Sequence, residues 1–141
     1  MPTLLVHMKI KTEHVVRFEE ILRDLVVETA RHEKDCLRYE YWRGSDVGQY
    51  YCLLSFPHST AFYEHQASPY HEKYAPEWGP MFESFRIEYV DPLSGGGSGL
   101  PRASAEPLPA GAPAALLEAQ KKYPIDLQAW WTGRVPPHVK D

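Results

Sequence analysis

Over residues 4–90 the spacing of apolar residues changes in a fixed order, and that order restricts the possible folds more than any other feature of the chain. Residues 4–11 alternate apolar and polar side chains, which predicts a strand with one buried face. From Thr12, which can cap a helix, to about His32, apolar residues recur at helical spacing. The chain is therefore predicted to begin with a strand and an amphipathic helix.

Two further strands are predicted as a hairpin. Residues 36–42 and 49–56 are rich in aromatic and other strand-favouring residues, and the intervening RGSDVG has turn chemistry. In this hairpin Cys52 is expected opposite Glu40, so Cys52 and Cys36 are not cross-strand neighbours. Two cysteines at this spacing favour neither a zinc site nor a disulfide framework, and we expect both thiols to be reduced.

A second helix and a fourth strand complete the pattern. Ser59 is expected to cap a helix that includes residues 61–66. Pro69 is a point of interruption, and Pro76 is expected to end the helical region. Residues 85–90 alternate again and predict the last strand.

The resulting order, β-α-β-β-α-β, predicts an α+β domain over residues 1–91 with a ferredoxin-like antiparallel sheet. Such a sheet carries helices on one face and leaves the other face bare. A domain of this size gains by burying its bare face against a second copy, so a homodimer with facing sheets is expected.

The composition changes after residue 91. Residues 92–113 hold five prolines, five glycines and no aromatic residue, which predicts a linker without a core of its own. Residues 114–141 are expected to form an arm with one short helix and the adjacent pair Trp130 and Trp131. Three docking sites remain open: the chain's own barrel, where the arm would act as a lid, the dimer mate, or another protein. A disordered tail is the remaining alternative.

Charge and hydropathy exclude some partners. The formal net charge is −4, which offers no basic face for nucleic acid. No apolar run approaches the length of a membrane helix or a secretory leader, so we expect no membrane span and a cytoplasmic protein.

Two motifs carry a family resemblance over residues 3–92. They are Glu-x-x-Cys-x-x-Tyr at residues 33–39 and Ala-Phe-x-x-His-x-x-Ser-Pro at residues 61–69. With them the chain resembles the antibiotic biosynthesis monooxygenase family of dimeric α/β barrels, and its quinol-monooxygenase-like branch most of all. The resemblance implies a pocket between sheet and helices and oxidation of quinols or polycyclic phenols by dioxygen without a cofactor.

The resemblance transfers to the site one residue at a time. The motif histidine falls on His65, which the resemblance implies as the catalytic residue. Tyr70 stands where quinol-monooxygenase-like members often carry a second histidine, and His71 is displaced by one position. A carboxylate common on the third strand of the family falls on Leu54, so that strand supplies no acid.

Oxidation of a phenol needs a base, an apolar cavity and polar contacts to the substrate. His65 is the first candidate base, followed by His7 on the first strand and His71, because a neutral imidazole is a competent base at physiological pH. Three further rings are interpreted either as a substrate-binding wall or as a subunit contact: Tyr70, Tyr74 and Trp78.

The remaining candidate groups are interpreted as structural. The run HEKD at residues 32–35 is interpreted as a solvated helix end, and no His, Cys or Asp cluster has the spacing of metal ligands.

Two functions are weighed. The first is a cofactor-independent monooxygenase for a small aromatic substrate. The second is a non-catalytic subunit of a larger assembly, with the barrel as scaffold and the arm as anchor.

Overall fold

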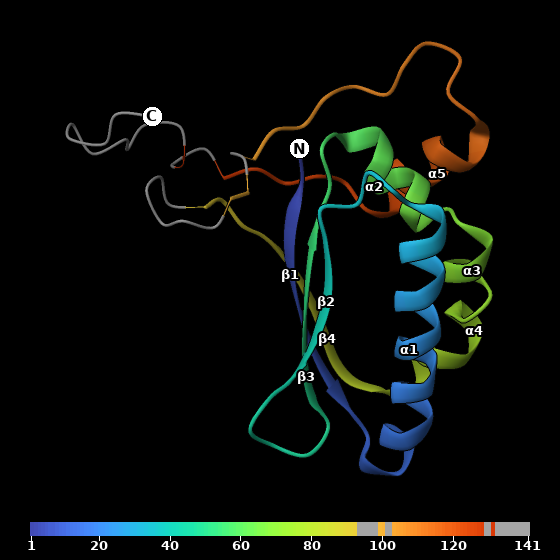
Figure 1. Ribbon diagram of the computed structural model, residues 1–141, viewed down its shortest axis with the longest axis vertical. Helices are drawn as coiled ribbons and strands as arrows, with labels where there is room; N and C mark the ends of the chain where they lie inside the picture. Colours follow the sequence, from blue (N-terminus) through green and yellow to red (C-terminus); the bar gives the residue numbers. More distant parts are fainter. Residues whose placement is uncertain (93–98, 101–102, 129–130, 132–141) are drawn as a thin grey trace.

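The described part of the chain forms a four-stranded antiparallel sheet with helices packed on one face (Figure 1). The computed structural model describes residues 1–92, 99–100, 103–128 and 131. The strand order is β2-β3-β1-β4, as in ferredoxin-like domains, which confirms the predicted fold class. The strands are β1 (Thr3–Ile10), β2 (Arg38–Arg43), β3 (Gln49–Ser55) and β4 (Phe82–Tyr89). In the described part of the chain, no helix lies on the opposite face of the sheet (Figure 1).

One long helix and several short ones cover the inner face of the sheet. The helices are α1 (Val15–His32), α2 (Ser59–Gln66), α3 (Pro69–Glu72), α4 (Ala75–Trp78) and α5 (Ala114–Lys122), with 3-10 turns at Thr12–His14 and Gly79–Met81. Figure 1 shows α1, α3 and α4 along the sheet, with α2 and α5 near the end where the chain begins. Among the described residues, no helix is long and apolar enough to cross a bilayer.

The core lies between α1 and the inner face of the sheet. On β1 every second residue is buried from Leu4 to Ile10, which is the predicted alternation. Phe18, Ile21 and Leu25 of α1 have no measurable exposure and pack against this face. Buried residues recur every second position in the strand and about every 3.6 positions in the helix, so each element has one buried face, and the two faces form one core.

The hairpin register differs by one residue from the prediction. Tyr41, not Glu40, lies opposite Cys52. The loop ends at Gly48, whose φ of 79° suits glycine and whose position leaves no room for a Cβ, because that atom would lie 2.2 Å from the Ile10 carbonyl oxygen. A one-residue shift exchanges the two faces of a strand, so it is Tyr39 and Tyr41 that point toward the helices.

Two predictions about α2 and its surroundings were wrong. The cap of α2 is His58, whose Nδ1 accepts a hydrogen bond from the Ala61 amide at 3.1 Å. Ser59 instead binds Glu106 of the C-terminal segment. Pro76 does not end the helical region but stands in the first turn of α4, where a proline costs no hydrogen bond.

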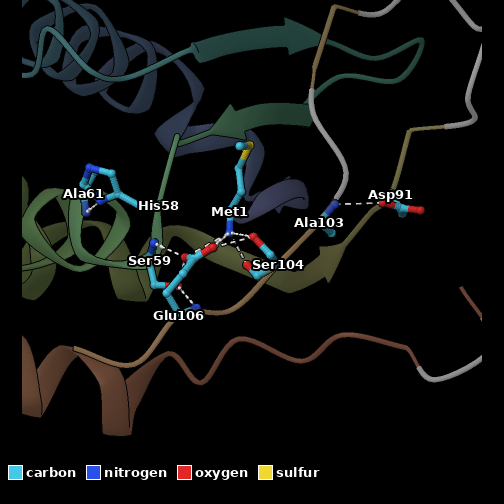
Figure 2. A network of polar contacts seen from close by, with 8 residues as sticks. All are labelled: Met1, His58, Ser59, Ala61, Asp91, Ala103, Ser104 and Glu106. Atoms are coloured by element: carbon cyan, nitrogen blue, oxygen red, sulfur yellow. Dashed lines mark hydrogen bonds and ion pairs between the residues drawn. The ribbon is translucent and has the colours of Figure 1, made fainter. Parts of the chain in front are cut away.

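The described C-terminal residues fold back onto the chain's own ferredoxin-like domain. Near the start of β1, Glu106 accepts hydrogen bonds from Ser59 and from the Met1 amine (Figure 2). Helix α5 packs on α2 and buries Leu116 and Ala119 in the core. Trp130 lies outside the described residues, and Trp131 is half-buried.

Candidate functional site

A cavity of about 440 Å³ lies between the inner face of the sheet and the helices that cover it. A site of this size suits a small aromatic molecule. Most of its wall is aliphatic or aromatic, and the polar groups come from a small set of side chains: Tyr39, Tyr41, Cys52, His65, Gln66, His71, Glu72, Lys122 and Tyr123. The arrangement is an apolar site with a few oriented polar atoms.

His65 of α2 lines this cavity and is fully buried. Its Nδ1 lies 2.8 and 3.0 Å from the two carboxylate oxygens of Glu33, which immediately follows α1. A carboxylate accepts hydrogen bonds, so Nδ1 carries the proton and Nε2 of the neutral ring carries the lone pair. Nε2 is buried without a hydrogen-bond partner among the described residues, so it is free to accept a proton from a ligand.

Further hydrogen bonds fix Glu33 and His65 in place. The Tyr70 hydroxyl donates to a Glu33 oxygen, and the Ser68 hydroxyl donates to the His65 carbonyl at 2.8 Å. Burial raises the pKa of Tyr70, and the hydrogen bond to the Glu33 carboxylate raises it further. Tyr70 is therefore protonated at neutral pH, and its hydroxyl holds the Glu33 carboxylate in position beside His65.

Aromatic rings pack around the imidazole of His65. Ring centroids lie 4.8 Å away for Tyr39, 5.2 Å for Phe56 and 5.2 Å for His71. Aromatic pairs at such distances are favourable and leave little freedom for ring rotation. His65 is thus positioned by packing as well as by its acid.

The second buried histidine differs from the first in its electrostatics. His71 is 7% exposed, and its Nδ1 has no hydrogen-bond partner among the described residues. Burial is the main cause that lowers the pKa of His71 to about 3, and the positive charges of Lys122 and of a protonated His65 contribute to that value. The ring is neutral at physiological pH, so one nitrogen can donate and the other can accept a hydrogen bond.

Two phenols add polar atoms to the sheet side of the cavity. The hydroxyls of Tyr39 and Tyr41 lie 3.0 Å apart, and both side chains line the wall. Burial raises the pKa of each of them well above the ordinary value. Both are therefore protonated. One hydroxyl donates to the other, so the pair has one O–H left to donate to a ligand oxygen.

The structure brings three of the six predicted site residues to the cavity. His65, His71 and Trp78 line it. Tyr70 does not line it but binds Glu33, and the Tyr74 hydroxyl donates to Asp24 of α1 at 2.6 Å.

His7 lies away from this group. Its side chain points to the other face of the sheet, because its neighbours Val6 and Met8 occupy the inner face. There its Nε2 lies 3.1 Å from a carboxylate oxygen of Glu88.

Several site residues were not predicted from the sequence. The most important is Glu33, because the run at residues 32–35 was interpreted as solvated. That interpretation holds for His32, Lys34 and Asp35, which are exposed, but the Glu33 side chain is only 14% exposed. A signal was present, since Glu33 begins the motif Glu-x-x-Cys-x-x-Tyr.

No metal site accompanies these residues in the described part of the chain, where no three His, Cys, Asp or Glu side chains gather as ligands. The chemistry that the described side chains can perform is proton transfer at Nε2 of His65, with hydrogen bonds to ligand oxygens from the phenols and His71.

Comparison with known proteins places the fold in one family. The family model described as antibiotic biosynthesis monooxygenase matches residues 1–77. No curated protein matches the sequence of the chain.

Solved structures resemble the fold. A proposed antibiotic biosynthesis monooxygenase from Caulobacter crescentus is 23% identical with a TM-score of 0.61, over 65% of this chain and 89% of that one. PA3566 from Pseudomonas aeruginosa is 22% identical with a TM-score of 0.58, over 63% and 91%. Rv0793 from Mycobacterium tuberculosis is 18% identical with a TM-score of 0.59, over 65% and 94%. About a third of this chain thus has no counterpart in these three structures.

Proposed function

The chain belongs to the antibiotic biosynthesis monooxygenase family, and on that premise we propose that it oxidises a quinol or polycyclic phenol with dioxygen, without a cofactor. The observation that carries the proposal is the His65 imidazole, whose Nδ1 is held by Glu33 and whose Nε2 is unpartnered at the wall of an apolar cavity.

In the first step the substrate binds with an acidic O–H or C–H group next to Nε2 of His65. The proton moves to Nε2, and the electron pair of the broken bond stays on the substrate. The resulting imidazolium lies beside the Glu33 carboxylate, which stabilises the positive charge. Glu33 therefore fixes the tautomer and the orientation of the His65 ring and balances the charge that forms on it.

In the second step the substrate anion donates electrons to dioxygen. One oxygen atom enters the substrate, and the other leaves as water together with two hydrogens of the substrate. For a quinol the product is a hydroxylated quinone. The substrate itself therefore supplies the four electrons that reduce dioxygen, and no other reductant is needed. An apolar wall favours this step, because dioxygen is apolar and the anion is poorly solvated there.

Other side chains of the cavity bind the substrate oxygens and rings. The hydrogen-bonded pair of Tyr39 and Tyr41 hydroxyls offers one donor on the sheet side, and neutral His71 is a donor or acceptor beside His65. Trp78 offers a flat apolar surface, and its ring centroid lies 5.0 Å from that of His71. These groups suit a flat molecule with more than one oxygen.

The alternative function, a non-catalytic subunit anchored by its C-terminal arm, has less support. An anchor must be free to reach another protein, but α5 buries Leu116 and Ala119 on its own barrel. The buried pair of His65 and Glu33 also lacks a purpose in a scaffold, because burying ionisable groups costs stability.

A homodimer forms part of the proposal. The outer face of the sheet exposes Trp42 and half-exposes Leu5 and Leu53, which lie opposite each other on β1 and β3. Charged side chains such as Glu40 and Arg86 lie beside them on the same face. A second copy would cover this mixed surface, as is common for self-complementary interfaces.

Oxygen uptake with a panel of quinols and hydroxyanthrones tests the proposal. The wild-type chain is expected to consume oxygen with at least one of them, and His65→Gln is expected to lower the rate about 100-fold or more. His7→Gln, the matched histidine change on the outer face of the sheet, is expected to keep the wild-type rate. Equal rates for His65→Gln and the wild type would remove His65 from the reaction.

A further inference from the structure

The segment after residue 102 is fastened to the barrel at a defined point. The Glu106 carboxylate accepts hydrogen bonds from the Ser59 amide at 2.9 Å and from the Ser59 hydroxyl at 2.8 Å, and the Glu106 amide donates back to that hydroxyl at 2.8 Å (Figure 2). Burial raises the pKa of Glu106, but hydrogen bonds from the Met1 amine, Ser104 and Ser59 outweigh it and hold the pKa below the ordinary value. The Glu106 carboxylate is therefore ionised at neutral pH, and its hydrogen bonds to Ser59 and to the Met1 amine are formed.

Helix α5 follows Glu106 in the chain and packs against α2, so that its last residue, Lys122, reaches the cavity. Leu116 and Ala119 face α2 and are 8% and 7% exposed, whereas Leu117 points outward at 42%. Beneath the segment, the Tyr63 ring is 2% exposed. The end of α5 is thereby held in one position over the barrel.

This docking brings Lys122 and Tyr123 to the cavity wall. Lys122 is the only lysine or arginine among the described residues that line the cavity. Its ammonium lies 5.0 Å from the centroid of the Tyr123 ring, and a hydrogen bond with Tyr123 raises the pKa of Lys122. The Lys122 ammonium is thus a permanent positive charge at the wall of a mostly apolar site.

Neither Glu33 nor Glu72 competes strongly with a ligand for this ammonium. The Glu33 carboxylate already accepts hydrogen bonds from His65 and Tyr70. Among the described residues that line the cavity, Glu72 is the only carboxylate, and its charge also raises the pKa of Lys122. The Glu72 side chain is 45% exposed to solvent, where screening weakens this attraction. Both Lys122 and Tyr123 lie outside residues 1–77, the part that matches the family model.

We propose that Lys122, held in place by the docked C-terminal segment, makes the cavity select aromatic ligands that carry an anionic oxygen, such as a carboxylate or an ionised phenol. The proposal rests on the proposed function in one respect, that this cavity is the substrate site. It narrows the substrate from aromatic molecules in general to aromatic anions. The rings of the ligand bind the apolar part of the wall, and its anionic oxygen lies beside Lys122.

Fluorescence titration with 2-naphthoate and 2-naphthamide tests the proposal without any turnover. The two probes share their rings and differ in charge, so the ratio of their Kd values isolates the contribution of charge. The full-length wild-type chain is expected to prefer the naphthoate by about fivefold at low salt, and the preference is expected to shrink at high salt.

Three variants of the full-length chain identify the source of the preference. Lys122→Met is expected to bind both probes with similar Kd values, whereas Lys122→Arg keeps the preference. Lys121→Met is the matched control, because Lys121 is the adjacent lysine, is 73% exposed and pairs with Glu118. It is expected to behave as the wild type. Unchanged thermal unfolding of all three variants excludes an effect through folding.

The outcomes separate this proposal from the proposed reaction. A wild-type chain without preference for the naphthoate, or a Lys122→Met variant that retains it, overturns the role of Lys122 even if oxygen is consumed. A preference that disappears only in Lys122→Met supports the role, even if no oxygen uptake is found and the proposed oxidation is abandoned.

Discussion

Glu33 holds the buried ring of His65 from a position 32 residues earlier in the chain, with its carboxylate oxygens 2.8 and 3.0 Å from Nδ1. The contact joins the end of α1 to α2 and leaves Nε2 of His65 without a partner in the described part of the chain. It turns a lone histidine into an oriented base.

The charge of Glu33 is expected to matter more than its shape. Glu33→Gln keeps a carbonyl oxygen that can accept from Nδ1 but removes the negative charge that stabilises the imidazolium. We expect kcat to fall about 10- to 100-fold with little change in KM, measured as oxygen uptake. Glu28→Gln is the control, because Glu28 lies earlier on α1 and pairs with Arg31 instead. An equal loss of activity in both variants would contradict the role of Glu33.

Glu19 is expected to make stability depend on pH. Its carboxylate accepts hydrogen bonds from Arg43 and Tyr50 and ties α1 to the hairpin. The hydrogen bond from Arg43 lowers the pKa of Glu19 to about 2 from an ordinary 4.5, although burial opposes the shift. A lowered folded-state pKa stabilises the fold above about pH 4.5, and this stabilisation is lost as the pH falls toward 2.

Urea unfolding of Glu19→Gln measures this contribution. We expect the variant to lose about 1–2 kcal/mol of unfolding free energy at pH 7 and to match the wild type near pH 2. Glu20→Gln, at the adjacent and more exposed position, is expected to change stability by less than about 0.5 kcal/mol. A difference between Glu19→Gln and the wild type that stays constant from pH 7 to 2 would refute the assignment.

The contribution of Leu116 to the docking of α5 can be measured by amide deuterium exchange in variants of two adjacent leucines. Leu116→Ala removes a buried side chain, so we expect the amides of α5 to exchange with deuterium about 10- to 50-fold faster. Leu117→Ala removes an exposed side chain and is expected to leave the exchange rates nearly unchanged. Equal exchange in the two variants would mean that the Leu116 contact does not hold the helix.

The outer face of the sheet is expected to be a subunit interface. Leu53→Arg places a charge on this face, and we expect it to convert the dimer to a monomer in light scattering. Val47→Arg, on the exposed hairpin loop, is expected to remain dimeric. A monomeric wild-type chain would rule out the proposed dimer.

The fold was predictable because its first strand and its long helix each show a clear period, and because the hairpin is rich in strand-favouring residues. The alternation of β1 and the helical spacing of α1 are local patterns, and local patterns are visible in a single sequence. The register of the hairpin was missed by one residue, and its loop ends at Gly48, which lies close to the Ile10 carbonyl of β1. That contact joins parts of the chain far apart in sequence.

The site was only partly predictable for the same reason. His65 stands in a motif and was found, whereas its acid was sought on β3 at Leu54 and lies instead after α1 at Glu33. Ser59 has the chemistry of a helix cap, but Glu106 competes for it from a segment with no pattern of its own. The contribution of Lys122 to the cavity follows from the same long-range docking.

The most direct test of the central claim is the deprotonation of a hydroxyanthrone in the absence of oxygen. The anion of such a compound absorbs at longer wavelength than the neutral form, so binding and proton loss can be followed before any oxidation. We predict that the wild-type chain produces the anion band at neutral pH and that His65→Gln binds the compound without producing it. The same anion band in both proteins would contradict the claim that Nε2 of His65 is the base.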